Sequence, residues 1–365
     1  MKEEKRNRRK VSYRKLAGRI GEEVREIPAV VAVIGGGPAG MEAAHVLANG
    51  GCEVLLFEAR PDLAANLTNK YRLFPNFADA ADIAGRLTDG LDHPRIRVLA
   101  HTEVVRLERE DETGEWRVET AEGDAHRVSA VLMATGYEVF DAHRKEELGY
   151  GIYDSVITSV DLEAMLKQQR VLTPLREDPR RIVFLQCVGS RDEKVGNRYC
   201  SKVCCVTAVK QAIEVKRLLP EVEAYVFYMD LRMWGQTFEE LYRTAQEQYG
   251  IRFVRGRISE AAGTFDGQVQ VKAEDTLIGQ QIKMTADLLV LMVGMEASCG
   301  TRRLAGQCDI AGEYGFARSM DPHLYDNLTQ RRGLFLAGTC KRPMSLTDVI
   351  NDARSAAMEI INYLS

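Results

Sequence analysis

The stretch Val30-Val31-Ala32-Val33-Ile34-Gly35-Gly36-Gly37-Pro38-Ala39-Gly40 decides the fold of this 365-residue chain. Its first five residues form an uninterrupted apolar run, which predicts a buried β-strand. The glycines that follow have the G-x-G-x-x-G spacing of a dinucleotide-binding turn, and a helix is expected over Met41–Asn49. Strand, glycine turn and helix in this order predict a Rossmann-type βαβ unit.

Each position of the turn has a physical role in binding a dinucleotide. The first glycine makes the tight turn, the second lets the backbone approach a pyrophosphate, and the third lets helix and strand pack closely. Proline suits the first turn of a helix, whose free N–H groups attract phosphate. A second strand, Glu53–Phe57, ends at Glu58, where an acid can hold the adenosine ribose hydroxyls. The residues predicted to bind the dinucleotide here are Gly35, Gly37, Pro38, Ala39, Gly40 and Glu58.

Two later segments extend this pattern. Val128–Met133 is a predicted strand that ends in Ala134-Thr135-Gly136, and Gly333–Thr339 is another, ending in Gly338-Thr339. A helix is expected over Leu346–Leu364, with Thr347 or Asp348 as its N-terminal cap. With these segments the chain resembles the two-dinucleotide-binding-domain flavoproteins along nearly its whole length. The resemblance implies an α/β, thioredoxin-reductase-like fold of two Rossmann-like domains, FAD in the first of them, adenine at Val104, and the flavin beside the last helix.

The second domain departs from an ordinary pyridine-nucleotide domain. After a strand predicted over Arg181–Gln186, with Ile182–Leu185 as its apolar centre, the chain reads Cys187-Val188-Gly189-Ser190-Arg191-Asp192 where a second glycine fingerprint is expected. A helix then begins near Cys204-Cys205 and runs to about Leu218, and a strand over Tyr225–Met229 ends at Asp230. The βαβ frame is therefore kept, while cysteines replace the phosphate-binding loop.

Four cysteines gather in this segment, at positions 187, 200, 204 and 205. Four thiolates in one short stretch of a chain without secretory features favour an iron–sulfur cluster or a zinc site over disulfides. Buried packing thiols are the alternative. Cys299, Cys308 and Cys340 form no C-x-x-C pair and are expected in the core or in loops, although Cys340 follows Gly338-Thr339 and is a candidate for a flavin contact.

The cysteine segment closely resembles the A-type flavin subunit of heterodisulfide reductase. The resemblance is carried by Cys-Val-Gly-Ser-Arg-Asp, by Tyr199-Cys200-Ser201-Lys202-Val203-Cys204-Cys205 and by the helix after it. In that family the cysteines bind a [4Fe–4S] cluster. Carried over to this chain, the resemblance implies the ligands Cys187, Cys200, Cys204 and Cys205, with Arg191, Lys194, Arg198 and Lys202 flanking them.

The chain also departs from that family. It has no C-x2-C-x2-C-x3-C run, Phe74-Pro75 is followed by no cysteine, and Leu63-Ala64-Ala65-Asn66 stands where a Gly-Gly is usual. It most resembles the short form of the heterodisulfide-reductase-like complex of sulfur oxidisers. We therefore expect an FAD and [4Fe–4S] electron-transfer subunit with B- and C-type partner subunits, and a homodimer. The alternatives are an NAD(P)H-dependent disulfide oxidoreductase, a subunit of the quinone-interacting complex of sulfate reduction, and a flavin module with structural zinc.

Composition sets the remaining bounds. With 49 Lys and Arg against 53 Asp and Glu, the net charge is −4, which argues against a nucleic-acid binder. The longest apolar run, Leu288–Met295, is strand-sized, so no membrane span is expected. Met1–Lys10 is crowded with charge, and we expect no secretory signal and a cytoplasmic location. The predicted parts are a basic arm (1–27), an FAD-binding domain (28–150 and 299–365), and a degenerate NAD(P)H-like domain (151–298).

Overall fold

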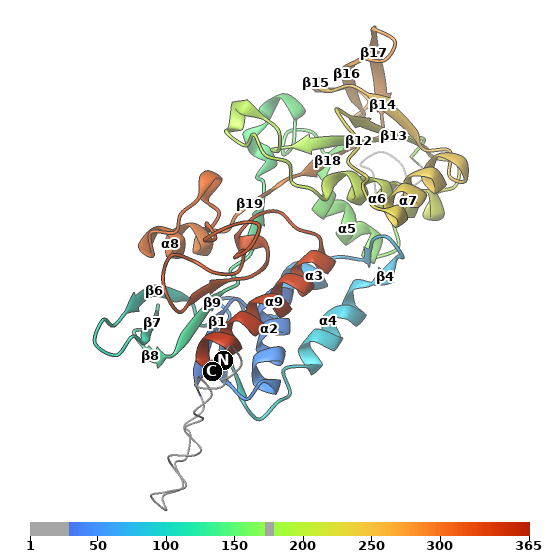
Figure 1. The fold of residues 1–365 in the computed structure, drawn as a ribbon. Helices are drawn as coiled ribbons and strands as arrows, with labels where there is room; N and C mark the ends of the chain where they lie inside the picture. The colour runs from blue at the N-terminus through green and yellow to red at the C-terminus, as the bar shows by residue number, and fades with distance from the viewer. Residues whose placement is uncertain (1–28, 172–178) are drawn as a thin grey trace, which may run out of the picture.

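The computed structural model describes residues 29–171 and 179–365, so the predicted arm at 1–27 lies outside the described residues. The fold contains two parallel sheets, each covered by helices on one face and by antiparallel strands on the other (Figure 1). This arrangement agrees with the expected α/β class. In the part of the chain with described coordinates, no helix has the length and apolar character needed to cross a membrane.

The first sheet has five parallel strands in the order β20-β9-β1-β2-β5. Their bounds are Leu334–Leu336, Ala130–Met133, Val30–Ile34, Glu53–Phe57 and Ile96–Leu99. Helices α2 (Pro38–Asn49), α4 (Ala80–Asp89) and α9 (Leu346–Leu364) cover one face, and Figure 1 shows α2 and α9 side by side. The other face packs against α8 (Cys299–Gln307) and the antiparallel strands β6 (Val104–Arg109), β7 (Trp116–Thr120) and β8 (Ala125–Val128).

The second sheet is also parallel, in the order β11-β18-β12-β13-β14. Its strands are Val156–Thr158, Leu288–Val293, Arg181–Val188, Glu223–Tyr228 and Arg252–Arg255. One face carries α5 (Ser159–Lys167), α6 (Cys204–Leu218) and α7 (Gln236–Glu247). The other packs on a three-stranded antiparallel sheet of β15 (Ile258–Gly263), β16 (Val269–Asp275) and β17 (Gln280–Ala286). Because both faces are covered, β18 is apolar throughout, as parallel strands usually are.

Two connections join the sheets. We call each parallel sheet with the elements packed on it a unit. Strands β10 (Tyr137–Val139) and β19 (Met295–Ala297) pair antiparallel where the chain leaves the first unit and returns to it. A loop of the first unit, with α3 (Ala65–Thr68), β3 (Arg72–Leu73) and β4 (Ala78–Asp79), reaches the helices of the second. The ring of Phe74 in this loop meets Phe238 of α7 edge to face, with 5.6 Å between the ring centroids. The first unit is thus packed against α5, α6 and α7.

Several predicted elements have different bounds in the structure. Helix α2 starts at Pro38 rather than Met41, and the strand expected at Val128–Met133 divides at Ser129 into β8 and β9. Strand β12 runs on to Val188 through an irregularity of register, so Cys187 lies at a strand end rather than in the loop after it. The domain boundaries given above stay a prediction.

Candidate functional site

A large cavity of about 630 Å³ lies at the carboxyl ends of the first sheet, within the range usual for small-molecule and cofactor sites. Eleven of the fourteen residues predicted to bind the dinucleotide line it: Gly35, Gly37, Pro38, Ala39, Glu58, Val104, Ala134, Thr135, Gly136, Thr339 and Thr347. Gly40, Gly338 and Asp348 do not line the cavity. Five segments that are far apart in the sequence are therefore brought together around one space.

The glycine turn has the geometry that the fingerprint predicts. Gly35 has φ +113°, and a Cβ there would lie 2.4 Å from the carbonyl oxygen of Ala134. A Cβ at Gly40 would lie 1.8 Å from the carbonyl oxygen of Gly35, so this position admits no side chain. At Gly37 an added Cβ would meet nothing within 4 Å, which leaves the turn open on that side. Gly40 therefore does not line the cavity; it allows helix α2 to pack closely against strand β1.

The amino-terminal end of α2 is free to bind an anion. Pro38 opens the helix, no side chain caps it, and no acid lies in its first turn. Glu58 lies beside it, with Oε2 accepting from the N–H of Gly36 at 2.7 Å and Oε1 accepting from the N–H of Arg60 at 2.8 Å. The carboxylate keeps lone pairs for two hydroxyl groups. Dipole, free N–H groups and a fixed carboxylate suit a pyrophosphate with a neighbouring ribose.

The cap predicted for the last helix was wrong. Ser345 is the N-cap of α9, and Asp348 is the third helical residue of a capping box, with its carboxylate 2.7 Å from the Ser345 hydroxyl and 3.1 Å from the Ser345 N–H. A serine followed three residues later by an acid is the usual capping-box pattern, and the sequence carried it. Asp348 also accepts from the ammonium of Lys202 at 2.7 Å, which links α9 to the cysteine segment.

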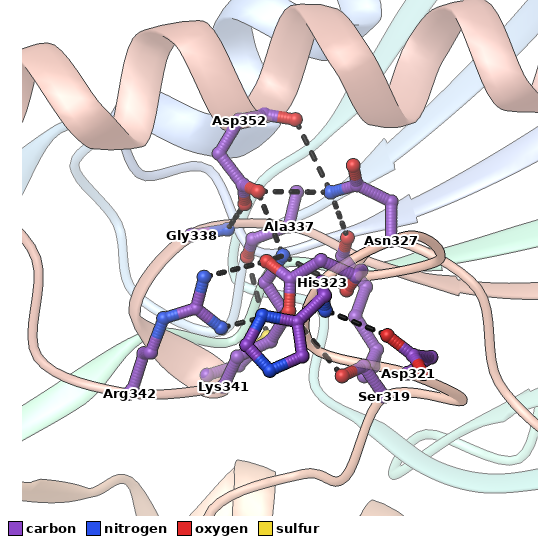
Figure 2. A network of polar contacts seen from close by, with 12 residues as sticks. Ser319, Asp321, His323, Asn327, Ala337, Gly338, Lys341, Arg342 and Asp352 are labelled. Carbon is purple, nitrogen blue, oxygen red and sulfur yellow. Dashed lines mark hydrogen bonds and ion pairs between the residues drawn. The ribbon is translucent and has the colours of Figure 1, made fainter.

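A buried polar network holds the turn Gly338-Thr339 against α9 (Figure 2). Asp352 of this helix accepts from the N–H of Gly338 at 2.6 Å and from the ammonium of Lys341 at 2.7 Å. Lys341, whose side chain is 1% exposed, also donates to the Asp326 carboxylate at 2.8 Å. Hydrogen bonds from Arg342 and Lys341 outweigh burial and lower the pKa of Asp326 to about 2. The network fixes the turn that carries Thr339 into the cavity.

The second unit supplies another wall of the same cavity, through Glu163 of α5 and through Val203, Thr207 and Lys210 at the start of α6. Buried Lys210 pairs with Glu163 and, at 3.0 Å, with Glu214. Its ammonium donates to the carbonyl of Arg72 at 3.0 Å, and Glu163 accepts from the N–H of Tyr71 at 2.9 Å. The sequence pattern gave no sign of this charged wall, because its two contacts with the loop span 92 and 138 positions.

The four cysteines come from two ends of one βα unit. Cys187 is the next-to-last residue of β12, and Cys204 and Cys205 open α6; all three are buried, while Cys200, in the loop between these elements, is half-buried. Cys204 lies within hydrogen-bonding reach of both Cys187 and Cys205. The N–H of Lys202 donates to Cys200 Sγ at 3.3 Å. Within the described ranges, no three His, Cys, Asp or Glu side chains are arranged to hold a metal ion.

The electrostatics of the three buried thiols are coupled. The hydrogen bonds from Cys204 lower the pKa of Cys187 and lower that of Cys205 to about 7, while they raise the pKa of Cys204. Arg191 adds positive charge beside Cys187 and Cys205. The thiols of Cys187 and Cys205 are thus more acidic than an ordinary cysteine, and thiolate is the form that binds metals.

Backbone and buried polar groups also mark this segment as a site. Cys187, Arg191 and Lys202 have φ of +60°, +53° and +63°, a conformation that residues other than glycine adopt mainly where the surroundings enforce it. Arg191 Nη2 binds Asp230 at 2.7 Å, but its buried Nη1 has no hydrogen-bond partner in the described part of the chain. Four thiols, two backbone N–H groups aimed at sulfur and a guanidinium nitrogen without an acceptor have the chemistry that suits an anionic group, although the described side chains do not converge on one metal position.

The remaining cysteines differ in position. Cys340 is fully buried, its thiol donates to the carbonyl of Met133 at 3.2 Å, and burial raises its pKa to about 12. It does not line the cavity, so the flavin contact considered for it finds no support. Cys299, expected in the core or a loop, is exposed at the first position of α8 and lines the cavity.

Comparison with known proteins adds sequence relatives. Residues 9–161 match the family model described as pyridine nucleotide-disulphide oxidoreductase. The A-type subunit of the H(2)/formate:CoB-CoM heterodisulfide,ferredoxin reductase of Methanococcus maripaludis is 40% identical over 245 residues, 64% of this chain and 37% of that protein. The second A-type iron-sulfur subunit of the CoB–CoM heterodisulfide reductase of Methanopyrus kandleri is 31% identical over 419 residues, 91% of this chain and 64% of that protein. This chain therefore matches between about a third and two thirds of the length of these relatives.

Solved structures show the same fold at low identity. Thioredoxin reductase of Lactococcus lactis superposes with a TM-score of 0.66 at 17% identity, covering 92% of this chain and 99% of that one. Thioredoxin reductase of T. acidophilum gives 0.63 at 15% identity, with 92% and 98% covered. The predicted two-domain, thioredoxin-reductase-like fold is confirmed.

Proposed function

The chain belongs to the family of the A-type subunit of heterodisulfide reductase, whose members are flavin-dependent oxidoreductases, and on this premise we propose that it is an FAD and [4Fe–4S] electron-transfer subunit. The complex it serves would be a heterodisulfide-reductase-like assembly of sulfur metabolism, acting on thiol/disulfide or sulfane-sulfur compounds. Its partners would be B- and C-type subunits. The chain itself would form a homodimer, and it would be located in the cytoplasm.

One observation carries this proposal: the helix that begins with two of the cysteines also lines the dinucleotide cavity. Cys204 and Cys205 open α6, while Val203 just before them and Thr207 and Lys210 just after them face the cavity. A cofactor in the cavity and a metal group on the cysteines would therefore be neighbours. Nearness of this kind is what electron transfer between two centres requires.

The residues proposed to hold FAD divide by the part of the cofactor they suit. The turn at Gly35 and Gly37 and the free end of α2 suit the pyrophosphate, and Glu58 suits the ribose. Thr339 and the N-terminus of α9 at Thr347 suit the flavin end. Cys187, Cys200, Cys204 and Cys205 are the proposed cluster ligands. When bound, FAD would supply a centre that exchanges two electrons and the cluster one that exchanges single electrons.

The first test is the metal content of protein purified without oxygen. About four iron and four sulfide per chain, an EPR signal after dithionite reduction and a flavin absorbance are expected. Serine at any of the four proposed ligands should lower the iron content, whereas Cys308→Ser, at a buried thiol elsewhere, should leave it unchanged. Zinc, or no metal, in protein that keeps its flavin would overturn the iron–sulfur assignment.

A second test addresses the alternative of an NAD(P)H-dependent disulfide oxidoreductase. In a nucleotide-binding βαβ unit the acid after the second strand is free for the ribose, but here Asp230 is paired with Arg191 of the cysteine loop. We therefore expect no flavin reduction when NADH or NADPH is mixed with the protein in a stopped-flow experiment. Rapid bleaching of the flavin by either nucleotide would favour the alternative.

A further inference from the structure

The segment that follows β13 lies directly against the cysteine site. The N–H of Arg232 donates to Cys205 Sγ at 3.5 Å, and this sulfur lies 3.7 Å from the carbonyl oxygen of Asp230. Met233 is buried at 6% exposure and anchors the segment on the core beneath α6 and α7. The backbone at 230–233 thus forms a thin wall between a buried thiol and the surface.

The side chains on either side of Met233 are turned toward solvent. Trp234 is 63% exposed, and the Lys202 ammonium lies over its indole, 4.8 Å from the ring centroid. Arg232 is exposed, and its guanidinium makes no hydrogen bond or ion pair with the residues that the structure describes. Tryptophan and arginine are among the residue types most enriched at the energetic centres of protein interfaces.

The charge around this pair is positive. Four cations, Arg191, Lys202, Arg232 and Arg255, stand against two carboxylates, Asp230 and Asp348, and a third acid, Glu239, in the first turn of α7. This local excess contrasts with the net charge of −4 of the whole chain. Positive patches of this kind attract and orient negatively charged partners.

We propose that Arg232 and Trp234, with Lys202 and Arg255 beside them, form the docking surface for an electron-transfer protein that presents an acidic face. Docking here would place the partner's redox centre across a single layer of backbone from Cys205. The chain's own N-terminal stretch does not suit this surface, because residues 1–27 hold ten Lys or Arg against five Glu. The inference rests on the proposed function, since it assigns the exit for electrons at the cysteine site.

Binding can be tested with an acidic flavodoxin as the probe. A basic cytochrome c, an electron-transfer protein of opposite charge, is the control. With the oxidised full-length protein, titration calorimetry at low salt should show flavodoxin binding that weakens strongly as salt rises, and no binding of cytochrome c. We expect Arg232→Glu and Trp234→Ala each to weaken binding by about tenfold or more. The matched controls are Arg243→Glu on α7 and Phe265→Ala at the β15–β16 turn, both exposed and away from the cysteines, which should bind as the parent does.

The outcomes separate this inference from the function on which it rests. The docking surface would be overturned by equal binding of flavodoxin to all four variants, by binding that does not change with salt, or by a preference for cytochrome c. None of these results would bear on the iron and flavin content of the protein. Absence of iron in protein that still binds flavodoxin through Arg232 would instead count against the cluster. Unchanged melting temperatures and flavin spectra would show that the variants are folded.

Discussion

The guanidinium of Arg191 lies 2.7 Å from the carboxylate of Asp230, which ties the cysteine loop to the end of the second strand of its βαβ unit. In a nucleotide-binding unit the same acid would face a ribose. Here it positions a cation beside Cys187 and Cys205, with one guanidinium nitrogen buried and unsatisfied in the described part of the chain. Asp230, at the position where a dinucleotide site has its ribose-binding acid, thus holds Arg191 beside the cysteines.

Replacing Arg191 by glutamine should make the nearby thiols less acidic. Without the guanidinium, the pKa values of Cys187 and Cys205 should both rise, because Arg191 supplies positive charge beside both sulfurs and a hydrogen bond to Cys187. The pH dependence of thiolate absorbance at 240 nm in metal-free protein measures this. Arg198→Gln is the control, since Arg198 is 70% exposed and pairs with Glu193; equal effects of the two changes would contradict the prediction.

The glycine turn should tolerate no side chain at its third glycine. In Gly40→Ala the new methyl would meet the carbonyl of Gly35 at 1.8 Å, so the helix must shift and the turn must open. We expect a loss of about 2 kcal/mol or more in the free energy of unfolding and a protein purified largely without flavin. Flavin absorbance per chain gives the readout. Gly85→Ala in α4, where an added Cβ meets nothing within 4 Å, should keep its flavin.

Glu214 should make the fold less stable as the solution becomes less acidic. Burial raises the pKa of Glu214 to about 7, which is above its value in the unfolded chain. Its contribution to the free energy of unfolding is therefore complete below the unfolded pKa and is lost as pH rises through about 7. Glu214→Gln should therefore flatten the fall in stability between pH 5 and pH 7.5 by roughly 2 kcal/mol, as urea unfolding at the two values would measure. An unchanged slope would mean that Lys210 keeps Glu214 ionised.

Asp326 should have the opposite dependence. Arg342 and Lys341 hold its pKa near 2, below the unfolded value, so its contribution is present above the unfolded pKa and is lost as pH falls toward about 2. Asp326→Asn should cost roughly 2 kcal/mol at pH 7 and about half of that at pH 3. Urea titrations at both pH values test this, with exposed Asp309→Asn as the comparison. A cost that is the same at both values would show that packing, and not charge, is lost.

Sequence alone predicted those features whose residues are close in the chain. The fingerprint from Val30 to Gly40, the acid at Glu58 and the helix from Cys204 to Leu218 each depend on local spacing, and the structure has them. The two-domain fold followed from the order of such segments and is confirmed. The capping box at Ser345 is also local, so the wrong assignment of the cap to Thr347 or Asp348 concerns a pattern that the sequence does contain.

Tertiary structure decided what distant residues do to one another. No spacing in the sequence indicates that Lys210 and Glu163 hold the loop at Tyr71 and Arg72, or that Lys202 reaches Asp348 across 146 positions. Cys187 likewise meets Cys204 and Cys205 because a strand end and a helix start come together. Periodicity and turn chemistry act over a few residues, so they specify elements; the charges and thiols of separate elements meet only when burial of the two sheets' apolar faces brings those elements together.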